Sequence, residues 1–456
     1  MNSDALARAI IKKLRDSGHE AWLVGGCVRD LLLGSKPKDY DVSTNARPDR
    51  ILDLFPNSGQ AGAHFGVVVV RDGDSQVEVA TFRSDHDYAD GRRPERVRFE
   101  TDARQDVLRR DFTINGLMMD PETGQVLDYI DGRADLERHL VRAIGDPEAR
   151  FREDHLRMLR AVRFAARLSY SIETKTFEAI RASHALILRV SAERIRDELT
   201  RILTEGGARR GFELLDASGM LADILPEIAA MKGVEQPPEY HPEGDVWTHT
   251  LLMLEMLGDS TRTLALGALL HDVGKPPTFR IAERIRFDGH TEEGVKLAHA
   301  LLSRLRYSRS ETEQVEALVA NHMRFKDVHR MKESTLKRFL RMPHFDEHLE
   351  LHRLDCLSSN RRLENYHLAK RKLEEFSKEE IQPKPLITGA DLIAAGYAPG
   401  PQFGRILSAL EDAQLEGRIG TAQEALALAA ELFRCESEAQ SSKDGDGESS
   451  ERRTES

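Results

Sequence analysis

Two aspartates, one residue apart, follow a paired glycine in the stretch GGCVRDLLLGSKPKDYDVST, residues 25–44. Asp39 and Asp41 stand at positions i and i+2, so on a strand both carboxylates project from the same face. Two carboxylates on one face hold divalent cations, and a pair of Mg²⁺ ions held in this way activates a hydroxyl nucleophile and neutralises a leaving pyrophosphate. The spacing therefore favours nucleotidyl transfer, against the alternative that both residues are exposed turn charges.

The residues around this pair are of types that bind a triphosphate. Gly25 and Gly26 follow the apolar run AWLV and predict a tight strand-to-helix turn, whose N–H groups approach phosphate oxygens. Arg29 is expected to reach the same phosphates. Glu78, in the alternating run VEVATF, is expected to supply a third catalytic carboxylate from a neighbouring strand. The alternative is that the glycines form only a corner of the chain.

Three further stretches follow in a fixed order. They are LRRDFTINGLMMD at 108–120, DYIDGRADL at 128–136 and GDPEARFREDHLRMLRAVRFAARL at 145–168. With them, the sequence resembles the nucleotidyltransferase superfamily that includes DNA polymerase β. It is more closely similar to the bacterial class II branch of CCA-adding tRNA nucleotidyltransferases and poly(A) polymerases.

This resemblance assigns roles to particular residues. Three are expected to contact the ribose: Arg110, Asp111 and Asn115. Asp154 and Arg157 match the E-D-x-x-R motif; they are three apart on a predicted helix, so they share a face that offers acceptors and a fork of donors. The resemblance implies that this pair selects cytosine or adenine by hydrogen bonds alone, in place of a nucleic-acid template. The alternative is a salt bridge between the two.

Arginines continue along the same predicted helix. Arg160 is expected at the nucleotide, and with Arg163 and Arg167 it forms a basic stripe opposite an apolar face. A solvated charged surface is the alternative for the stripe. The next stretch, SAERIRDEL, resembles a family helix in which Glu193 and Arg196 are expected to brace the pocket.

Histidines and aspartates recur farther along the chain, where an apolar run ends in an adjacent His-Asp pair. Imidazoles and carboxylates are ordinary ligands of first-row metals, and a metal-bound water can attack phosphate. The segment resembles the HD phosphohydrolase superfamily, whose four core ligands match His249, His271, Asp272 and Asp355. Two more histidines match second-metal or phosphate contacts of some members: His290 and His322. We expect a divalent transition metal or Mg²⁺ here, and Mg²⁺ at the first site.

The pattern of elements predicts an α+β N-terminal nucleotidyltransferase domain of the polymerase β type, followed by all-α domains that include an HD-type helical domain. The expected ranges are 1–145 for the catalytic head, 146–235 for a helical base-recognition and RNA-binding domain, 236–375 for an HD metal-dependent phosphohydrolase-like domain, 376–434 for a C-terminal helical RNA-binding segment, and 435–456 for a disordered acidic tail.

Charge and cysteine content narrow the setting. The net charge is −11, but residues 436–456 carry seven acidic and three basic side chains, so the tail contributes −4 of this total. A basic groove can coexist with an acidic total, because binding responds to local potential. We expect no signal peptide and no membrane span. The three cysteines are scattered and odd in number, which favours a reducing compartment, so a cytoplasmic location is expected.

Together these features predict a template-independent RNA 3′-end nucleotidyltransferase that adds CCA to tRNA, or to another RNA 3′ end, from CTP and ATP, with no DNA partner. Poly(A) polymerase or an A-adding enzyme is the close alternative, since those enzymes share every motif above. An HD phosphohydrolase whose N-terminal part only holds RNA is less favoured. A non-enzymatic RNA scaffold is disfavoured, because unneutralised carboxylates repel phosphate. The Gly-punctuated segment 385–419 is expected either to contact RNA or to supply caps and turns.

Overall fold

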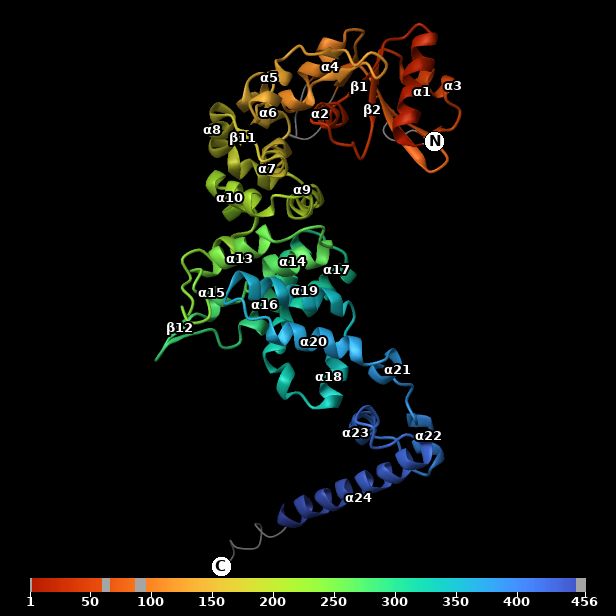
Figure 1. The fold of residues 1–456 in the computed structure, drawn as a ribbon, viewed down its shortest axis with the longest axis vertical. Coiled ribbons are helices and arrows are strands. Elements are labelled where there is room, and N and C mark those ends of the chain that lie inside the picture. The colour runs from red at the N-terminus through yellow and green to blue at the C-terminus, as the bar shows by residue number, and fades with distance from the viewer. Residues whose placement is uncertain (1, 60–65, 87–95, 448–456) are drawn as a thin grey trace, which may run out of the picture. The chain divides into compact units, whose positions relative to one another are not determined.

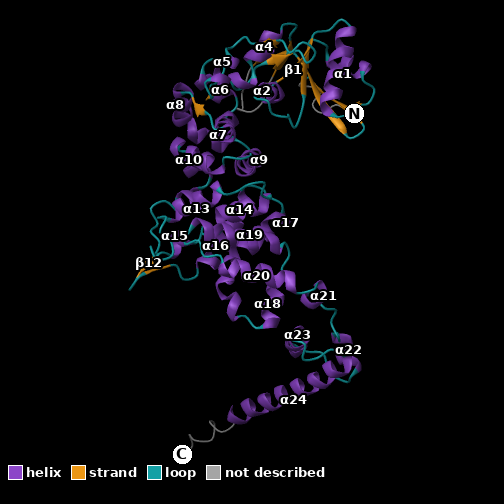
Figure 2. Cartoon of the chain, in the orientation of Figure 1, coloured by secondary structure: helices purple, strands orange, loops and turns teal. Residues whose placement is uncertain are grey.

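The computed structural model describes residues 2–59, 66–86 and 96–447. Its chain forms two compact units, residues 1–319 and 320–456 (Figure 1). The division falls inside the predicted 236–375 domain, so the five predicted domain ranges stay predictions. Figure 2 shows that most strands belong to the N-terminal part of the first unit and that helices dominate the rest of both units.

A mixed sheet forms the framework of the N-terminal part. Among the described residues its strand order is β3-β4-β5-β2-β1-β8-β9. The strands are β1 (Ala21–Val24), β2 (Asp41–Thr44), β3 (Ser58–Gly59), β4 (Val67–Asp72), β5 (Ser75–Thr81), β8 (Met118–Met119) and β9 (Val126–Leu127). β2 and β5 are parallel, whereas β1 pairs antiparallel with β2 and β8. The runs AWLV and VEVAT are therefore strands, as predicted, and VVVV is a third.

Helices lie around this sheet, and side chains of both form the buried core. The helices are α1 (Ser3–Asp16), α2 (Gly26–Leu32), α3 (Pro48–Leu54), α4 (Ala103–Leu108), the 3₁₀ turn η2 (Thr113–Asn115) and α5 (Gly132–Glu137). A separate antiparallel pair is formed by β6 (Arg83–His86) and β7 (Arg96–Phe99). Val24, Val107 and Met118 pack with Phe82 in one buried cluster. Burial of such side chains stabilises the fold by about 1.5–3 kcal/mol each, so the cluster fixes β1 and α4 beside each other.

The chain then becomes helical, as the period of its apolar residues predicts. This region comprises α6 (Pro147–Glu153), α7 (Leu156–Leu168), α8 (Thr174–Ser183), η3 (His184–Arg189), α9 (Ala192–Thr204), α10 (Ala208–Ser218), α11 (Met220–Ile224) and α12 (Pro226–Ala229), with a short parallel pair of β10 (Leu140–Val141) and β11 (Ser171–Ile172). That strand pair was not predicted, because two residues are too few for a period to appear.

The remainder of the first unit carries three of the histidines predicted as metal ligands, His249, His271 and His290. Its elements are α13 (Val246–Glu255), α14 (Arg262–Leu270), α15 (Lys275–Thr278), the hairpin of β12 (Arg280–Ile281) and β13 (Ile285–Arg286), α16 (His290–Arg304) and α17 (Arg309–Asn321). A methyl group on Gly274 would collide with the His290 carbonyl oxygen and with Gly294. The absence of a side chain at Gly274 thus lets the start of α15 pack closely on α16.

The second unit is helical throughout its described residues. It contains η4 (His322–Arg330), α18 (Glu333–Leu340), α19 (Phe345–Ser358), α20 (Glu364–Glu375), α21 (Lys378–Ile381), α22 (Gly389–Ala394), α23 (Gln402–Leu415) and α24 (Ala422–Gly447). Lys337 donates to the Leu415 carbonyl oxygen at 2.7 Å, which joins α18 to α23. Gly396 has φ +93° and its N–H closes the end of α22, so it is a turn glycine.

The predicted fold class is confirmed. At the C-terminus α24 continues to Gly447 and residues 448–456 lie outside the described part, so the disordered tail expected from residue 435 stays a prediction. Extending an existing helix avoids the cost of nucleation, so a polar segment can continue one without burying a core. No helix among the described residues is long and apolar enough to cross a membrane.

Candidate active site

The turn between β1 and α2 is the first segment of the chain that contributes to the site. Gly25 has φ +75°, a conformation that glycine adopts without strain, and a Cβ there would lie 3.2 Å from Arg110 Nη1. A side chain at this position would thus press on the Arg110 guanidinium. Gly26 begins α2, as predicted. The paired glycine therefore brings bare backbone against a charged side chain.

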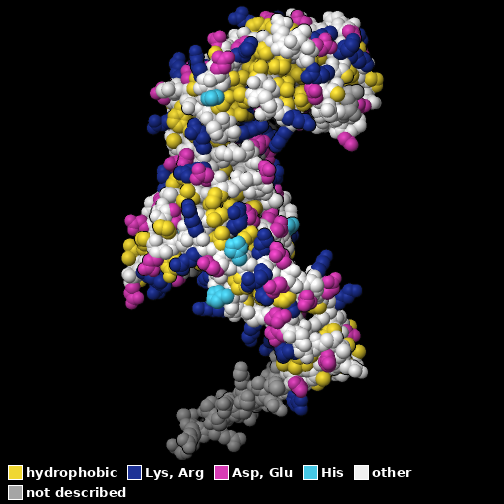
Figure 3. All heavy atoms as spheres, viewed as in Figure 1, with side chains coloured by type: hydrophobic (Ala, Val, Ile, Leu, Met, Phe, Trp, Pro, Cys, Tyr) yellow, Lys and Arg dark blue, Asp and Glu magenta, His cyan; other side chains and the backbone are white. Residues whose placement is uncertain are grey.

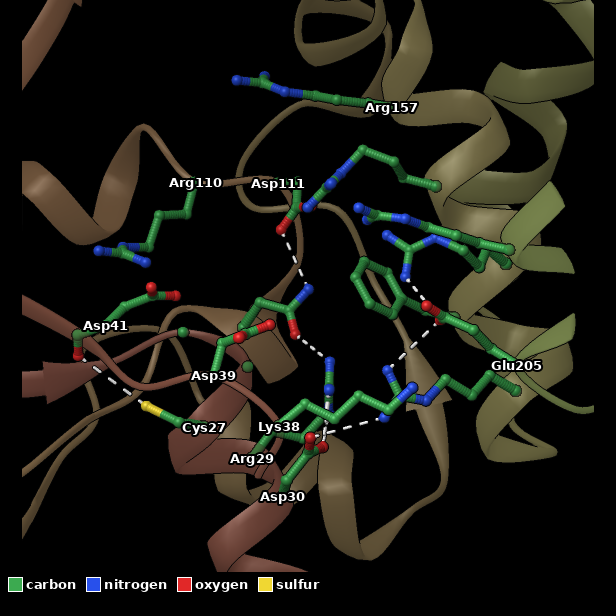
Figure 4. A pocket seen from close by; sticks show the side chains of 18 of the residues that line it. Cys27, Arg29, Asp30, Lys38, Asp39, Asp41, Arg110, Asp111, Arg157 and Glu205 are labelled. Carbon is green, nitrogen blue, oxygen red and sulfur yellow. Dashed lines mark hydrogen bonds and ion pairs between the residues drawn. The ribbon is translucent and has the colours of Figure 1, made fainter. Parts of the chain in front are cut away.

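The two aspartates lie beside this turn. β2 begins at Asp41, so Asp39 precedes the strand and the prediction that both project from one strand face is wrong. Both nevertheless line the same cavity (Figure 4). Asp41 stands opposite Glu78 in the parallel register of β2 and β5. Burial and the repulsion of Glu78 raise the pKa of Asp41 to about 6. Crowded carboxylates of this kind match a cation site.

Arg110 faces Asp41 across the cavity (Figure 4) and is held there from the other side. Its Nη2 donates to Asp106 Oδ2 at 2.9 Å and to Ser43 Oγ at 3.2 Å. Asp106 is fully buried; burial opposes its ionisation, but Arg109 and Arg110 lower its pKa to about 2. A buried anion therefore positions the arginine that the family resemblance places at the ribose.

A chain of hydrogen bonds joins four of the predicted nucleotide contacts. Arg29 donates to Asn115 Oδ1 at 2.7 Å, and Asn115 donates to Asp111 Oδ1 at 3.2 Å. Arg160 donates to Asp111 Oδ2 through two nitrogens, at 2.8 and 2.6 Å. Burial disfavours the Asp111 anion, but Arg160 lowers the pKa of this carboxyl to about 2. The chain connects α2, η2 and α7 through residues far apart in sequence.

The E-D-x-x-R motif departs from its prediction. Asp154 is not helical: its backbone is extended at φ −143°, between α6 and α7, and its Oδ1 accepts from the Leu156 N–H at 3.1 Å. Aspartate commonly ends one helix and begins another in this way, because its carboxylate competes for free N–H groups. Asp154 Oδ2 accepts from Arg194 at 2.8 Å. The two motif residues therefore do not share a helical face.

Arg157 has partners of its own. It donates to Glu153 Oε2 at 2.7 Å and to the Arg109 carbonyl oxygen at 3.1 Å. Among the described residues, Asp154 pairs with Arg194 and Arg157 pairs with Glu153, so the predicted alternative of a salt bridge between Asp154 and Arg157 is not observed. Both side chains still line the cavity. Arg157 thus joins α7 to the loop that carries Arg110.

The basic stripe on α7 is largely an internal ion-pair network. Arg163 is buried and donates to Glu198 Oε2 of α9 at 2.6 Å. Arg160 approaches the same glutamate at 3.8 Å. Glu193 and Arg196 of α9 were expected to brace the pocket. Arg196 instead donates to the Arg306 carbonyl oxygen, and Glu193 is exposed.

A cavity of about 530 Å³ collects these groups. The predicted residues that line it are Gly25, Gly26, Arg29, Asp39, Asp41, Arg110, Asp111, Asn115, Asp154, Arg157 and Arg160; Glu78 does not. Ten arginines and lysines and six carboxylates occur in this lining, a local charge of +4 inside an acidic chain. In Figure 3 both signs of charge are interspersed on the visible surface of the first unit.

Several functional candidates were missed from the sequence. They are Lys38, Arg109, Arg201 and Glu205 in the lining, with Arg194 and Glu198 behind it, where they pair with Asp154 and Arg163. Arg194 and Glu198 are four residues apart on α9, hence on one face, so helical spacing within SAERIRDEL was the signal that could have identified them. The residues chosen instead, Glu193 and Arg196, lie on other sides of the same helix.

A second cluster lies around the His-Asp pair of the first unit. His271 Nε2 is 3.0 Å from Asp272 Oδ2, His290 Nε2 is 3.9 Å from Asp272 Oδ1, and the His249 and His271 rings are 5.3 Å apart between centroids. Burial lowers the pKa of His290. Lys275 donates to Asp272 at 2.7 Å. Neutral imidazoles around a buried carboxylate are suitable metal ligands.

The other predicted ligands of this site belong to the second unit. His322 is the first residue of η4, and Asp355 lies on α19. Their participation stays a prediction, as do the roles of the residues above.

The mixed sheet presents carboxylates to a basic cavity, which defines a nucleotidyltransferase-type head. The helices that follow carry a His-Asp cluster, which defines an HD-type domain. Three family models agree with that class: the poly A polymerase head domain matches residues 21–142, the probable RNA and SrmB-binding site of polymerase A matches 169–232, and the HD domain matches 245–357.

Curated relatives include the CCA-adding enzyme of Lactobacillus helveticus, 40% identical over 256 residues, which are 55% of this chain and 63% of the relative. The CCA-adding enzyme of Geobacillus thermodenitrificans is 43% identical over 223 residues, 49% of this chain and 55% of the relative. The alignments thus span less than two thirds of these relatives' own lengths.

Among solved structures, the CCA-adding enzyme of Bacillus stearothermophilus in complex with CTP covers 97% of this chain and 100% of its own, with a TM-score of 0.74 and 24% identity. The Thermotoga maritima enzyme complexed with tRNA covers 94% and 95%, with a TM-score of 0.58 and 19% identity. These likenesses establish the fold. Models of the poly A polymerase head, of an RNA-binding site of polymerase A and of the HD domain thus match successive parts of this chain.

Proposed function

We propose that this protein is a template-independent nucleotidyltransferase that builds or repairs the CCA end of tRNA from CTP and ATP. The supporting observation is that Asp39 and Asp41 line one cavity with Asp154 and Arg157. A single bound nucleoside triphosphate would then meet metal-binding carboxylates and base-recognising groups together. Relatives named as CCA-adding enzymes, and solved relatives in complex with CTP, ATP and tRNA, give further support.

The carboxylates fit a divalent cation. Asp41 faces Glu78 across the strand register, and burial, together with the repulsion of Glu78, raises the pKa of Asp41 to about 6. Asp39 and Asp41 would hold Mg²⁺, with Glu78 as a nearby carboxylate; when bound, the ions supply activation of the RNA 3′-hydroxyl and neutralisation of pyrophosphate. Arg110, fixed by Asp106, is placed to bind the triphosphate or the ribose.

Nucleotide selection would come from protein hydrogen bonds. The Asp154 carboxylate accepts and the Arg157 guanidinium donates, which are the two kinds of group that a Watson–Crick edge requires. Their present partners, Arg194 and Glu153, hold both side chains at the cavity. Arg29, Asn115 and Asp111 would meet the sugar or the phosphates, with Arg160 bracing Asp111.

The His-Asp cluster supports a second proposal, a metal-dependent phosphohydrolase activity. His271 donates from Nδ1 to the Ala268 carbonyl oxygen at 3.0 Å, since a carbonyl only accepts. In the neutral ring Nε2 then carries a lone pair, and it faces Asp272 Oδ2 at 3.0 Å. Lys275 donates to the same Oδ2 at 2.7 Å. The imidazole nitrogens and the Asp272 carboxylate together are a donor set that fits a transition metal or Mg²⁺. When bound, the metal would supply an activated water.

We further place the protein in the cytoplasm, because Cys27 and Cys356 are buried free thiols, as expected in a reducing compartment. Poly(A) polymerase and A-only addition remain the alternatives within the family. They are separated by incubating a tRNA that lacks its 3′ end with CTP, ATP or both, and sequencing the product ends. Products that stop at CCA support the proposal; A-tracts, or one A added only to a CC end, would replace it with the alternative.

A further inference from the structure

Glu243 lies between two imidazoles in the segment just before α13. Its Oε1 is 2.8 Å from Nδ1 of His241 and 2.7 Å from Nδ1 of His249. The side chains of Glu243 and His249 are 7% and 0% exposed. The HD superfamily motif described above does not include this glutamate. Its carboxylate nevertheless lies within hydrogen-bonding distance of His249, the first expected metal ligand.

The local backbone fixes Glu243 in this position. Gly244 has φ +127°, which turns the chain back so that Glu243 reaches the first turn of α13. Asp245 then caps that helix, accepting from the Thr248 N–H at 2.8 Å and from the Gly233 N–H at 2.6 Å. The backbone that follows Glu243 in the chain therefore holds its carboxylate at the start of α13.

This contact determines which nitrogen of His249 carries the proton. A carboxylate only accepts, so Nδ1 of His249 donates, and in the neutral ring Nε2 keeps its lone pair. The His249 ring lies 5.3 Å from the His271 ring between centroids. His271 has the same polarity, since its Nδ1 donates to the Ala268 carbonyl oxygen. Both rings are thus prepared to bind a metal through Nε2.

We propose that Glu243 is a positioning residue that orients His249 as an Nε2 metal ligand. This inference rests on the metal-site part of the proposed function. A carboxylate behind a ligating imidazole fixes the ring and raises its basicity, and loss of such a partner typically weakens metal binding 10–100-fold.

A different arrangement of the same residues is a metal site of its own. Ligand atoms of His241, Glu243 and His249 lie within 4.8 Å of one another. The observed separations of 2.7 and 2.8 Å are those of charge-assisted hydrogen bonds, which is why the positioning role is favoured. The hydrogen bonds agree with the lowered pKa of Glu243: burial opposes ionisation, but the two imidazoles bring the pKa to about 2.

The test is a Ni²⁺ titration of the full-length protein by calorimetry. Ni²⁺ is chosen because it prefers imidazole ligands to the carboxylate oxygens of the Mg²⁺ site in the head. His271→Ala identifies the ion that belongs to the His-Asp cluster. Glu243→Gln is expected to weaken the affinity for that ion by 10–100-fold. His241→Gln is expected to leave this affinity within about twofold of wild type, since Glu243 still faces His249. Glu239→Gln, at an exposed neighbouring glutamate, is the matched control. Circular dichroism and nucleotide incorporation by the head verify that each variant is folded.

The outcomes separate the possibilities. Suppose that His271→Ala loses the ion but that wild type and Glu243→Gln bind it with equal affinity. This result would overturn the positioning role while leaving the metal site intact. An ion that is lost in His241→Gln and kept in His271→Ala would replace that role with a site on His241, Glu243 and His249. A wild-type protein that binds no Ni²⁺ at either place would overturn both the metal site and the inference.

Discussion

The carboxylate of Asp154 accepts a hydrogen bond at 2.8 Å from Arg194, a residue of α9 that lies 40 positions farther along the chain. The residue proposed to recognise the base is therefore held by a helix that the E-D-x-x-R motif does not include. Asp154 has extended backbone between α6 and α7, and its carboxylate is oriented by two contacts, the Leu156 N–H on Oδ1 and Arg194 on Oδ2. Arg194 is thus expected to affect nucleotide choice without touching the base.

We predict that Arg194→Ala lowers kcat/KM for CTP and ATP about tenfold, the effect of losing one hydrogen bond to a charged group, about 1.5 kcal/mol. Discrimination against GTP and UTP is expected to fall as well, since the Asp154 carboxylate becomes free to rotate. Steady-state incorporation with each of the four nucleotides measures both effects. Arg181→Ala, at an exposed arginine on α8, serves as control. Unchanged selectivity in Arg194→Ala would refute the orienting role.

Asp154→Ala and Arg157→Ala are predicted to alter nucleotide choice more strongly. Each removes half of the donor and acceptor set proposed for the base edge, so the preference for CTP and ATP should shift by about tenfold to a hundredfold. Competition between pairs of nucleotides on one RNA primer measures the shift. Arg152→Ala changes an exposed arginine of α6 and is expected to have no effect. Native selectivity at a reduced rate in both site variants would show that they serve only the structure.

The sequence could predict this site only in part, and the helix boundary explains why. The E-D-x-x-R spacing fits a helix, so Asp154 was expected to share a face with Arg157. A carboxylate that caps α7 breaks the helix instead, and competition of this kind between side chain and backbone has no periodic signal. The strands and helices that carry long apolar patterns, such as β4, β5 and α7, were predictable for the opposite reason.

The network behind the cavity was hidden for a related reason. The arginines of α7 appear as a basic stripe in the sequence, whereas Arg160 and Arg163 point inward to Asp111 and Glu198. Whether an arginine faces water or a buried carboxylate depends on how helices pack, which local sequence does not encode. Asp39 and Asp41, in contrast, stand out from their spacing and both line the cavity although only Asp41 lies on the strand, and their catalytic role stays a prediction.

Asp106→Asn is predicted to destabilise the head domain in a pH-dependent way. The folded pKa of Asp106 is about 2, below its unfolded value of about 3.8, so its contribution to stability is complete above pH 4 and is lost as pH falls through that range. The shift corresponds to about 2 kcal/mol at pH 7.

Urea unfolding at pH 7, 5, 4 and 3, followed by a probe in the head domain, measures this contribution. The difference between wild type and Asp106→Asn should be largest at pH 7 and 5 and should narrow below pH 4. Asp102→Asn at the start of α4 provides a comparison at an exposed aspartate, where no such narrowing is expected. A difference that stays constant from pH 7 to pH 3 would contradict the ion-pair account of how Arg110 is positioned.

The most direct test of nucleotidyl transfer at this cavity compares wild type with Asp39→Ala and Asp41→Ala on a tRNA that lacks its 3′ end, in the presence of Mg²⁺, CTP and ATP. Asp74→Ala, in the exposed β4–β5 turn, is the control. Each site variant is predicted to lose at least a thousandfold in incorporation while binding the tRNA within about twofold of wild type, because the carboxylates act on the reaction and other residues bind the RNA. Incorporation at the wild-type rate in either variant would contradict the assignment of this carboxylate pair as the catalytic centre.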